Sequence, residues 1–386
     1  MNRAARFHLA SSTQVPLRIL TVVPICDGHD SAIITINIEL VRNGIEVIYL
    51  GYHRSARDIV RAAIQEDVRA IGISSYNGGH IEFFSEVLAL LRHEGAGHIG
   101  VFGGGGGTIT RADAKIMKRR GVDEIFFAGT SLLHMVKFVK QTYGGGLNHT
   151  FRMGNRSSDL KIVRQLWAAR NRRNGSPGSR RKPGEPSSST RVVGITGPGG
   201  AGKTTLIDEL TLRFLKARAG RRLAILSHDP SSGPGGAMLG DRATMVYAQD
   251  DRVFMRSLAT RGRPGGLAAE TRVSLAILKS NGFDLILVES TGIGQEDRPF
   301  PRGLVDRQVL VMSPDYGSRL QLQKIAMLET ADIVVSNKSD LPAAPTAIAE
   351  IQHRLGFNER GQQLISTVAK RHADPGVDAL FDAIFE

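Results

Sequence analysis

The amino-terminal part of the chain alternates short apolar runs with longer segments in which apolar residues recur every third or fourth position. The short runs have the length of buried strands, and the longer segments have the period of helices that cover a sheet. Strands are predicted at Leu17–Val23, Glu46–Leu50, Ala70–Ser74, Ile99–Phe102 and Glu124–Phe127. Helices are predicted between them, for example at Ser55–Glu66 and Ile81–Arg92. This order predicts a doubly wound α/β domain over residues 17–145, after a flexible leader at residues 1–16.

The second half opens with an apolar run, a glycine-rich turn and an amphipathic segment. Residues 192–195 lead into Gly197–Thr205, which fits the pattern G-x-x-x-x-G-K-[ST]. In this context the backbone N–H groups of the turn cradle phosphate oxygens. Lys203 is predicted to reach the β- and γ-phosphates, and the Thr204 hydroxyl to bind Mg²⁺. The nucleotide-binding residues predicted here are Gly200, Ala201, Gly202, Lys203, Thr204 and Thr205.

A second motif, Asn337-Lys338-Ser339-Asp340, indicates which base is bound. It follows the apolar run 333–335, so it stands at the carboxyl end of a strand, where open α/β sheets bind ligands. Asp340 can accept hydrogen bonds from guanine N1–H and the exocyclic amine, a donor pair that adenine lacks. Asn337 and the Lys338 stem would hold the edge and the face of the base. Alone, such a string is more often a polar turn, but after a phosphate loop it predicts GTP.

Acidic side chains lie between these two motifs. Asp229, Asp241 and Glu289 each follow an apolar run and are the candidate Mg²⁺ ligands together with Thr204. The alternative for each acid is a helix cap after a strand. The segment 290–295 continues from Glu289 as a glycine-containing loop that could sense the γ-phosphate. The predicted catalytic residues are Lys203, Glu289 and Gln295.

Several motifs in the second half, taken in order, resemble the MeaB/ArgK-type G-protein chaperones of cobalamin-dependent acyl-CoA mutases. They are D-P-S-S at 229–232, L-G-D at 239–241 and E-S-T-G-I-G-Q at 289–295. The resemblance implies a P-loop GTPase domain over residues 191–386. It also implies GTP hydrolysis coupled to the loading and protection of adenosylcobalamin on a mutase. Where that family carries an arginine shortly after L-G-D, this chain has Thr244, which leaves the rate of hydrolysis open.

The first loop of the amino-terminal domain contains Asp27-Gly28-His29. A neutral imidazole can bind a transition metal through one nitrogen while a carboxylate holds the N–H on the other. A D-x-H triplet alone is far more often a polar turn. Here, however, Ser74 ends one predicted strand and Gly103 follows another, so the three loops share one edge of the sheet. Glycines at that edge would let a bulky ligand lie against the backbone.

This arrangement resembles the cobalamin-binding domain of adenosylcobalamin mutases, and the order of domains resembles the fused isobutyryl-CoA mutases. The resemblance implies a flavodoxin-like fold, with His29 as the lower axial cobalt ligand and Asp27 as its orienting partner. The cofactor-binding residues that it implies are His29, Asp27, Gly28, Ser74, Tyr76, Gly103 and Gly104. Two positions depart from the family pattern: Ala32 stands where glycine is expected and Tyr76 where leucine is expected.

Cysteine content, charge and hydrophobicity limit the classes of protein to which this chain can belong. The chain has 386 residues, one cysteine and a formal net charge of +13. A lone Cys26 excludes a disulfide framework and suits a reducing, cytoplasmic location, and no apolar segment reaches membrane-spanning length. The stretch 146–190 is predicted to be a basic linker with a short amphipathic helix at 157–167 that docks onto a domain. A basic linker without aromatic interleaving is a poor nucleic-acid platform, so no nucleic-acid partner is expected.

These features predict a GTP-hydrolysing, adenosylcobalamin-binding subunit or chaperone that lacks the substrate barrel. Its expected partner is a separate acyl-CoA mutase large subunit, of isobutyryl- or methylmalonyl-CoA type, and an adenosyltransferase is a second candidate partner. Isomerase activity would then require the substrate-binding subunit. Two alternatives stay open: a cobalamin carrier or sensor without a mutase, and a remnant that keeps only GTPase activity. Ala32 and Thr244 are the hints toward the remnant.

Overall fold

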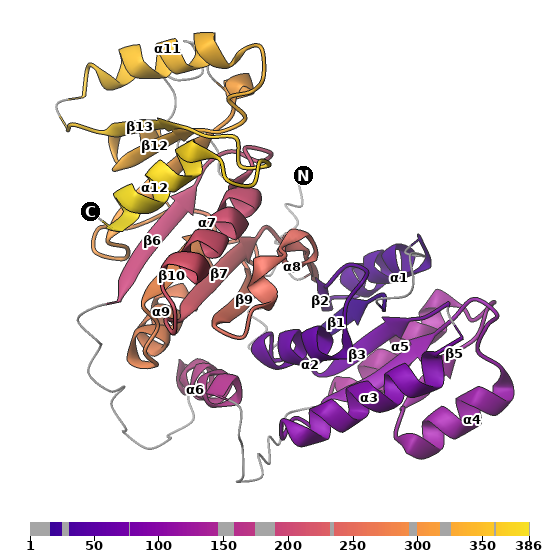
Figure 1. Ribbon diagram of the computed structural model, residues 1–386. Coiled ribbons are helices and arrows are strands. Elements are labelled where there is room, and N and C mark those ends of the chain that lie inside the picture. The colour runs from indigo at the N-terminus through magenta and orange to yellow at the C-terminus, as the bar shows by residue number, and fades with distance from the viewer. Residues whose placement is uncertain are drawn as a thin grey trace, which may run out of the picture.

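The computed structural model describes residues 16–24, 31–76, 78–145, 158–173, 190–231, 235–292, 299–316, 326–358 and 360–385. Within these ranges the chain forms a six-stranded and a seven-stranded sheet, each flanked by helices (Figure 1). Neighbouring strands pair in parallel in both sheets. Because the carboxyl ends of parallel strands share one edge, each sheet has an edge suited to ligand binding.

The first sheet has the strand order β5-β4-β3-β1-β2-β8, and its first five strands have the flavodoxin-like order. Its own strands are β1 (Arg18–Val22), β2 (Glu46–Tyr49), β3 (Ala70–Ser74), β4 (Gly100–Gly104) and β5 (Glu124–Phe126). The helices between and after them are α1 (Ser31–Arg42), α2 (Ala56–Gln65), α3 (His80–His93), α4 (Arg111–Arg120) and α5 (Leu132–Tyr143). The predicted doubly wound fold is confirmed.

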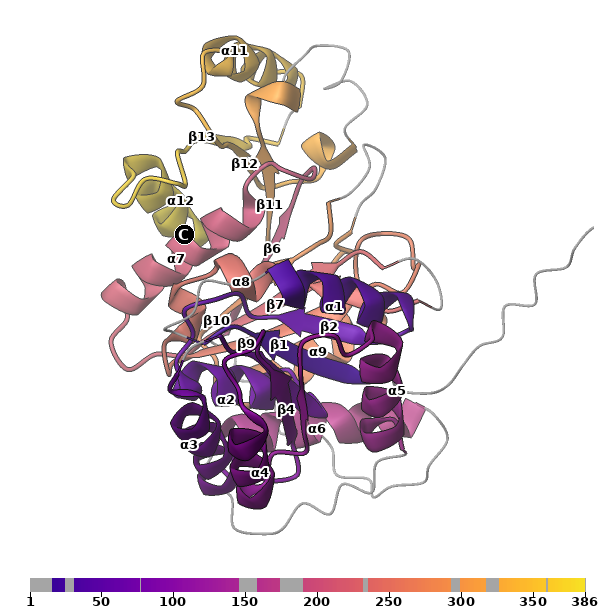
Figure 2. The same ribbon diagram turned by 90° about the vertical axis from the view of Figure 1, so that its right-hand side faces the viewer.

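Alternation along the strands divides the helices between the two faces of this sheet. Leu20 and Ile71 pack with α2, α3 and α4, whereas their neighbours Ile19 and Ala70 pack with α1 and α5. Successive side chains of a strand point to opposite faces, so a fully apolar strand can be buried on both. Figure 2 shows α3 and α4 on one side of the sheet and α1 and α5 on the other.

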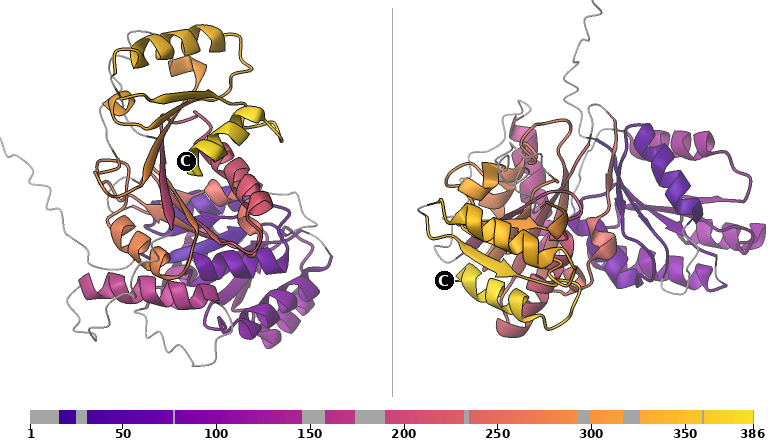
Figure 3. Two further views of the ribbon diagram at one scale, coloured as in Figure 1. Left: turned by 60° about the vertical axis from the view of Figure 1, so that its left-hand side comes forward. Right: turned by 90° about the horizontal axis from the view of Figure 1, so that it is seen from above.

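The second sheet has the order β13-β12-β11-β6-β10-β7-β9. Its strands are β6 (Arg191–Thr196), β7 (Leu223–Asp229), β9 (Val253–Ala259), β10 (Leu285–Glu289), β11 (Arg307–Met312), β12 (Ile333–Ser336) and β13 (Gln363–Ser366). Its helices are α7 (Lys203–Ala217), α8 (Asp241–Thr244), α9 (Thr271–Ser280), α11 (Ala344–Leu355) and α12 (Pro375–Phe385). Among the described residues, 3₁₀ turns occur at Tyr247–Gln249, Pro314–Tyr316 and Ala326–Glu329. Helices α7 and α12 lie side by side on one face (Figure 3).

The linker contributes helix α6 (Ser158–Arg173), which overlaps the helix predicted at 157–167 and extends beyond it. Ile162, Val163 and Leu166 pack with α9 against the second sheet, while Leu160 joins the core of the first domain. Residue 157 and the rest of the linker, 146–156 and 174–189, lie outside the described residues. No helix in the described ranges has the length and apolar content needed to span a membrane.

Strand β8 (Ala237–Leu239) departs from the order along the chain. It follows β7 of the second sheet, yet it pairs with β2 at the edge of the first sheet. The two halves of the chain therefore share a sheet, and helix α8 lies between them in Figure 1.

Candidate functional site

The phosphate loop connects β6 to α7, as the sequence predicts. Gly197 has φ +142°, and a Cβ there would stand 2.0 Å from the carbonyl oxygen of Val311. Gly202 has φ +91°, and a Cβ there would stand 2.4 Å from Nδ2 of Asn337. Side chains are excluded at both positions by the backbone angle and by space. The glycines thus fix a turn whose N–H groups precede the first turn of α7.

Lys203, the first residue of α7, is 7% exposed. Its Nζ donates hydrogen bonds to the carbonyl oxygens of Gly197 at 3.0 Å and Pro198 at 3.1 Å. Burial lowers the pKa of Lys203, while the nearby carboxylates of Glu289 and Asp241 act in the opposite direction. The ammonium group is therefore held over the phosphate loop and close to acidic side chains.

The predicted metal ligands converge beside this loop. The Thr204 hydroxyl donates to Oε1 of Glu289 at 3.0 Å. The Ser227 hydroxyl donates to the carboxylate of Asp241 and lies 3.4 Å from Oε2 of Glu289. Asp229 ends β7, next to β10, which ends at Glu289. Ser227 was not among the predicted residues.

Burial disfavours the ionised form of these carboxyl groups. Burial, together with the charge of Asp241, raises the pKa of Glu289 to about 8. Burial likewise raises the pKa of Asp229 and of Asp241. Oδ2 of Asp229 is buried and has no hydrogen-bond partner within the described parts of the chain. A buried acidic cluster with an unpaired oxygen fits a cation.

A complete protein cage for a metal is nevertheless missing from the described residues. No group of three or more His, Cys, Asp or Glu side chains there could hold a metal ion by itself. Mg²⁺ keeps waters and takes few protein ligands beside substrate phosphates. The cluster therefore fits Mg²⁺ bound together with a nucleotide.

His228 supports this cluster and was not predicted. Its Nδ1 donates to the carbonyl oxygen of Glu289 at 2.7 Å, and its Nε2 lies 2.7 Å from the Thr271 hydroxyl. Burial lowers the pKa of His228 to about 4, so the ring is neutral at pH 7. A carbonyl oxygen can only accept, so the proton of the neutral ring is on Nδ1. His228 thereby ties the backbone at the end of β10 to α9.

The predicted base-binding motif lies at the end of β12, next to the phosphate loop. Nδ2 of Asn337 donates to the carbonyl oxygen of Ala201 at 2.9 Å. Its Oδ1 accepts from the Thr367 hydroxyl at 3.0 Å and from the Ala369 N–H at 3.1 Å. Asn337 therefore joins the phosphate loop to the loop after β13. That third loop was missed by the sequence prediction, because it contacts Asn337 through a threonine hydroxyl and a backbone N–H, which form no recognisable motif.

Asp340 and Lys338 stand at the same edge. Lys338 has φ +59°, which turns the chain sharply after Asn337. Asp340 forms an ion pair with Nζ of Lys370 at 2.5 Å, and this hydrogen bond lowers the pKa of Asp340. The carboxylate is therefore ionised at neutral pH and can accept hydrogen bonds.

In the amino-terminal domain, the predicted cofactor residues within the described ranges lie at one edge. Ile73 pairs with Gly103 and Ser74 with Gly104 at the carboxyl ends of β3 and β4. Tyr76 follows β3, and its side chain is 45% exposed. The predicted cobalt loop, with Asp27, Gly28 and His29, lies outside the described residues, as does Gln295 of the nucleotide site.

Packing inside the domain explains the first two glycines of the run. A Cβ on Gly103 would stand 2.4 Å from the carbonyl oxygen of Ile73, and one on Gly104 would stand 2.6 Å from that of Phe126. Gly107, further along, has open space where a Cβ would stand. Gly103 and Gly104 are therefore required by contacts with neighbouring backbone, whereas Gly107 borders open space.

Exposed aromatic residues also follow strands at this edge of the sheet. Tyr52 follows β2 and is 53% exposed, and Phe127 follows β5 and is 37% exposed. Tyr76 is also exposed and follows β3, so the three rings stand at the carboxyl ends of three separate strands.

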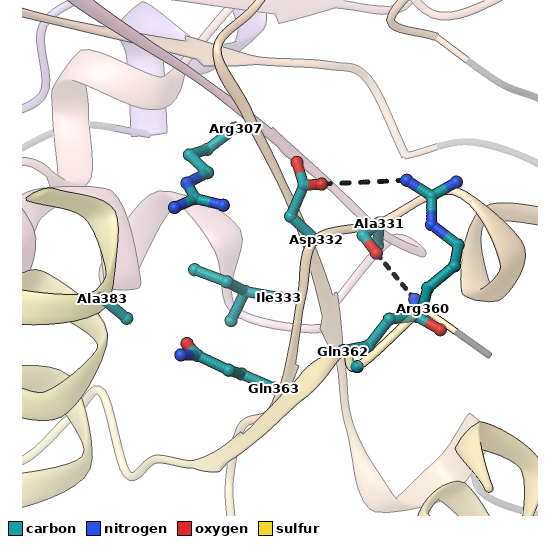
Figure 4. A pocket seen from close by; sticks show the side chains of 9 residues that line it. Arg307, Ala331, Asp332, Ile333, Arg360, Gln362, Gln363 and Ala383 are labelled. Carbon is teal, nitrogen blue, oxygen red and sulfur yellow. Dashed lines mark hydrogen bonds and ion pairs between the residues drawn. The ribbon is translucent and has the colours of Figure 1, made fainter. Parts of the chain in front are cut away.

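The two described hollows lie elsewhere. One, of about 130 Å³, is at the amino ends of β11, β12 and β13, where Asp332 and Arg360 form an ion pair (Figure 4). The other, of about 320 Å³, is at the amino end of β4, beside Tyr143. Each is at the edge opposite to the sites described above, so neither belongs to them.

A phosphate loop after the first strand of a parallel sheet, a cation-suited acidic cluster and a base-binding loop define a P-loop nucleotide-binding protein. The chain belongs to the MeaB family: the family "Methylmalonyl Co-A mutase-associated GTPase MeaB" matches residues 183–386. The family "B12 binding domain" matches residues 17–136. The predicted pairing of a cobalamin-binding domain with a MeaB-type GTPase domain is confirmed.

Curated relatives contain both domains in one chain. The fused isobutyryl-CoA mutase of Geobacillus kaustophilus is 36% identical over 96% of this chain and 36% of that enzyme. That of Cupriavidus metallidurans is 36% identical over 95% of this chain and 35% of the enzyme. That of Nocardia farcinica is 35% identical over 96% of this chain and 36% of the enzyme. The chain thus spans about a third of the length of these relatives.

Proposed function

We propose that this chain is a Mg²⁺-dependent GTPase that binds adenosylcobalamin and serves an acyl-CoA mutase as a subunit or chaperone. The observation that carries the proposal is the meeting of Lys203, Thr204 and the cluster of Asp229, Asp241 and Glu289 at one phosphate loop. The same chain carries a B12-binding domain.

At the nucleotide site, the phosphates bind the N–H groups of the glycine-rich turn and the Lys203 ammonium. Thr204, Asp241, Glu289 and Asp229 are the residues that would hold Mg²⁺, directly or through water. When bound, Mg²⁺ neutralises charge on the phosphates. Lys203 acts as a fixed positive charge where negative charge grows in the transition state. Gln295 and Glu289 are the further catalytic residues proposed.

Guanine is proposed to bind between Asn337, Lys338 and Asp340. The ionised Asp340 accepts from N1–H and the exocyclic amine, and the Lys338 stem covers a face of the base. Lys370 holds the Asp340 carboxylate by its ion pair. A carboxylate held in this way discriminates against adenine, because an adenine N1 would offer a lone pair to a negative charge.

At the proposed cobalamin site of the amino-terminal domain, His29 is the proposed lower axial cobalt ligand and Asp27 the group that orients its ring. Gly28, Ser74, Tyr76, Gly103 and Gly104 are proposed to line the cofactor. When bound, adenosylcobalamin supplies the radical chemistry, and the protein's part is to hold and orient it. The exposed Tyr76 after β3 and the open space at Gly107 support this placement.

The proposed partner is an acyl-CoA mutase large subunit on a separate chain. Support comes from the names of the relatives, which pair this GTPase family with methylmalonyl-CoA mutase and these two domains with isobutyryl-CoA mutase. Purified protein mixed with candidate large subunits should give mutase activity that neither component has alone.

GTP turnover tests the phosphate-loop assignment. Lys203→Ala should lower turnover by a factor on the order of 10²–10³, the usual cost of removing one group that stabilises the transition state. Lys216→Ala is the matched control, because Lys216 is an exposed lysine in the last turn of the same helix. Undiminished GTP turnover in Lys203→Ala would contradict the assignment of the phosphate loop.

A further inference from the structure

The nucleotide site takes one of its acids from a segment that the amino-terminal domain holds. Residues 235–245, here named the bridging segment, contain β8 and α8. β8 pairs with β2, with Glu46 opposite Ala237 and Ile48 opposite Leu239. The N–H of Gly236 donates to the carbonyl oxygen of Val41 at 3.0 Å. The strand that leads to Asp241 therefore belongs physically to the cobalamin-binding domain.

Two consecutive residues of the bridging segment serve different neighbours. Asp241 accepts a hydrogen bond from Ser227 in the acidic cluster. Arg242 is 1% exposed, and its Nε donates to Oε1 of Glu66 at 2.7 Å while its Nη2 donates to Oε1 of Gln65 at 2.6 Å. Gln65 and Glu66 stand at the end of α2 in the other domain. The backbone around Asp241 is thus anchored across the domain boundary.

Arg54 is a second anchor. Its Nη2 donates to the carbonyl oxygens of Arg242 and Ala243, each at 3.0 Å. Arg54 also forms a parallel bridge with Pro24, the last described residue before the predicted cobalt loop. Gly51, at φ +80°, lies so close to Ala243 that a Cβ there would be 3.3 Å from the Ala243 Cβ. The loop after β2 therefore connects the cobalamin edge to the bridging segment.

Helix α8 has four residues and no side-chain cap at its start. A single helical turn is not stable by itself, because nucleation costs more than one hydrogen bond returns. The Thr244 hydroxyl donates to the carbonyl oxygen of Asp241 at 3.0 Å, a hydrogen bond that stays within α8. The position of the Asp241 carboxylate therefore depends on what holds α8 from outside. Arg54, Gln65 and Glu66 hold it from the amino-terminal domain, and the carbonyl oxygen of Met255 accepts from Arg242 within the GTPase domain.

We propose that the cobalamin-binding domain positions Asp241, so that the metal site of the GTPase is complete only while the two domains are docked. Arg54 and Glu66 are positioning residues in this proposal, which rests on the proposed function of the nucleotide site. It makes the Mg²⁺ affinity of the GTPase depend on a contact with the domain that binds the cofactor.

The test measures Mg²⁺-dependent binding of a fluorescent GTP analogue to the full chain. The variants are Arg54→Met, which removes both hydrogen bonds to the bridging segment, and Glu66→Gln, which removes the charge facing Arg242. Asp67→Asn is the control: it breaks the Arg256–Asp67 ion pair of 3.5 Å across the same boundary, and asparagine tolerates the φ of +53° there. Arg54→Lys, which keeps the charge, replaces Arg54→Met if the latter does not fold.

The Mg²⁺ concentration for half-maximal binding should rise about tenfold or more in Arg54→Met, because one charge-assisted hydrogen bond alone is worth about that factor and two are lost. Analogue binding in EDTA should stay within about twofold of wild type, because the phosphate loop itself is untouched. Amide hydrogen exchange should become faster at residues 237–245 and remain unchanged in α7.

An unchanged Mg²⁺ requirement in folded Arg54→Met and Glu66→Gln would overturn the inference. An equal rise in Asp67→Asn would overturn the positioning role of Arg54 and Glu66, because any weakened contact between the domains would then have the same effect. Failure of wild type to hydrolyse GTP would contradict the proposed function instead. The ratio of Mg²⁺ requirements is measured by binding and so separates the two failures.

Discussion

Asn337→Ala should destabilise the GTPase domain and weaken GTP binding together. The side chain is 3% exposed and makes three hydrogen bonds, to Ala201, Thr367 and Ala369. Alanine removes all three and leaves a buried carbonyl, a hydroxyl and an N–H without that partner. At roughly 1 kcal/mol for each, the change in the free energy of unfolding is about 3 kcal/mol. For a domain of this size, that corresponds to a fall in Tm of about 6–12 °C.

Thermal unfolding followed by tryptophan fluorescence measures this change, because Trp167 is the sole tryptophan and lies on α6, which packs against the second sheet. GTP affinity should fall about tenfold or more, since the phosphate loop loses its tie to the loop after β13. Asn358→Ala is the control: it removes hydrogen bonds to Leu328 and Gln362 away from the site and should leave GTP affinity unchanged. A Tm within about 2 °C of wild type for Asn337→Ala would refute the reasoning.

Three further predictions concern the same site. Asp340→Asn should weaken the preference for GTP over xanthosine triphosphate by about tenfold or more, measured by competition binding, because the amide offers a donor where guanine needs an acceptor. Since burial raises the pKa of Glu289 to about 8 in the folded protein, stability without Mg²⁺ should fall as the pH rises from about 4.5 to 8. Mg²⁺ affinity should rise over the same interval, and urea unfolding with and without Mg²⁺ checks both; a pH-independent difference would contradict the assigned cause. Gly202→Ala should lower the free energy of unfolding by about 2 kcal/mol or more, because its φ is +91° and its Cβ would stand 2.4 Å from Asn337; an unchanged urea midpoint would be inconsistent with that contact.

Local sequence patterns were sufficient to predict the helices and strands and those motifs that lie within a single loop. The predicted strand Ala70–Ser74 matches β3 in both bounds, because its residues are buried on both faces and the pattern is continuous. Gly197–Thr205 could be recognised because the phosphate loop needs its glycines and its lysine at fixed spacing. In such cases the physical requirement and the sequence signal occupy the same few residues.

Contacts between distant segments could not be predicted in this way. Arg242 and Glu66 are 176 residues apart. Nothing in the sequence around Asp241 indicates that the neighbouring arginine points away from the nucleotide site. β8 has three residues, too few to show an alternation, and it pairs with the sheet of the other domain. The role of His228 was not predictable either, because its partners Glu289 and Thr271 are distant in the sequence.

An absorbance titration of adenosylcobalamin into the purified protein tests the central claim, that this GTPase chain carries the cofactor of its partner enzyme. Wild type and the control His93→Ala, an exposed histidine at the end of α3, should show a saturable change as the cofactor's own base is displaced. His29→Ala should lack that change. The absence of any spectral change at micromolar protein, or an unaltered change in His29→Ala, would contradict the account.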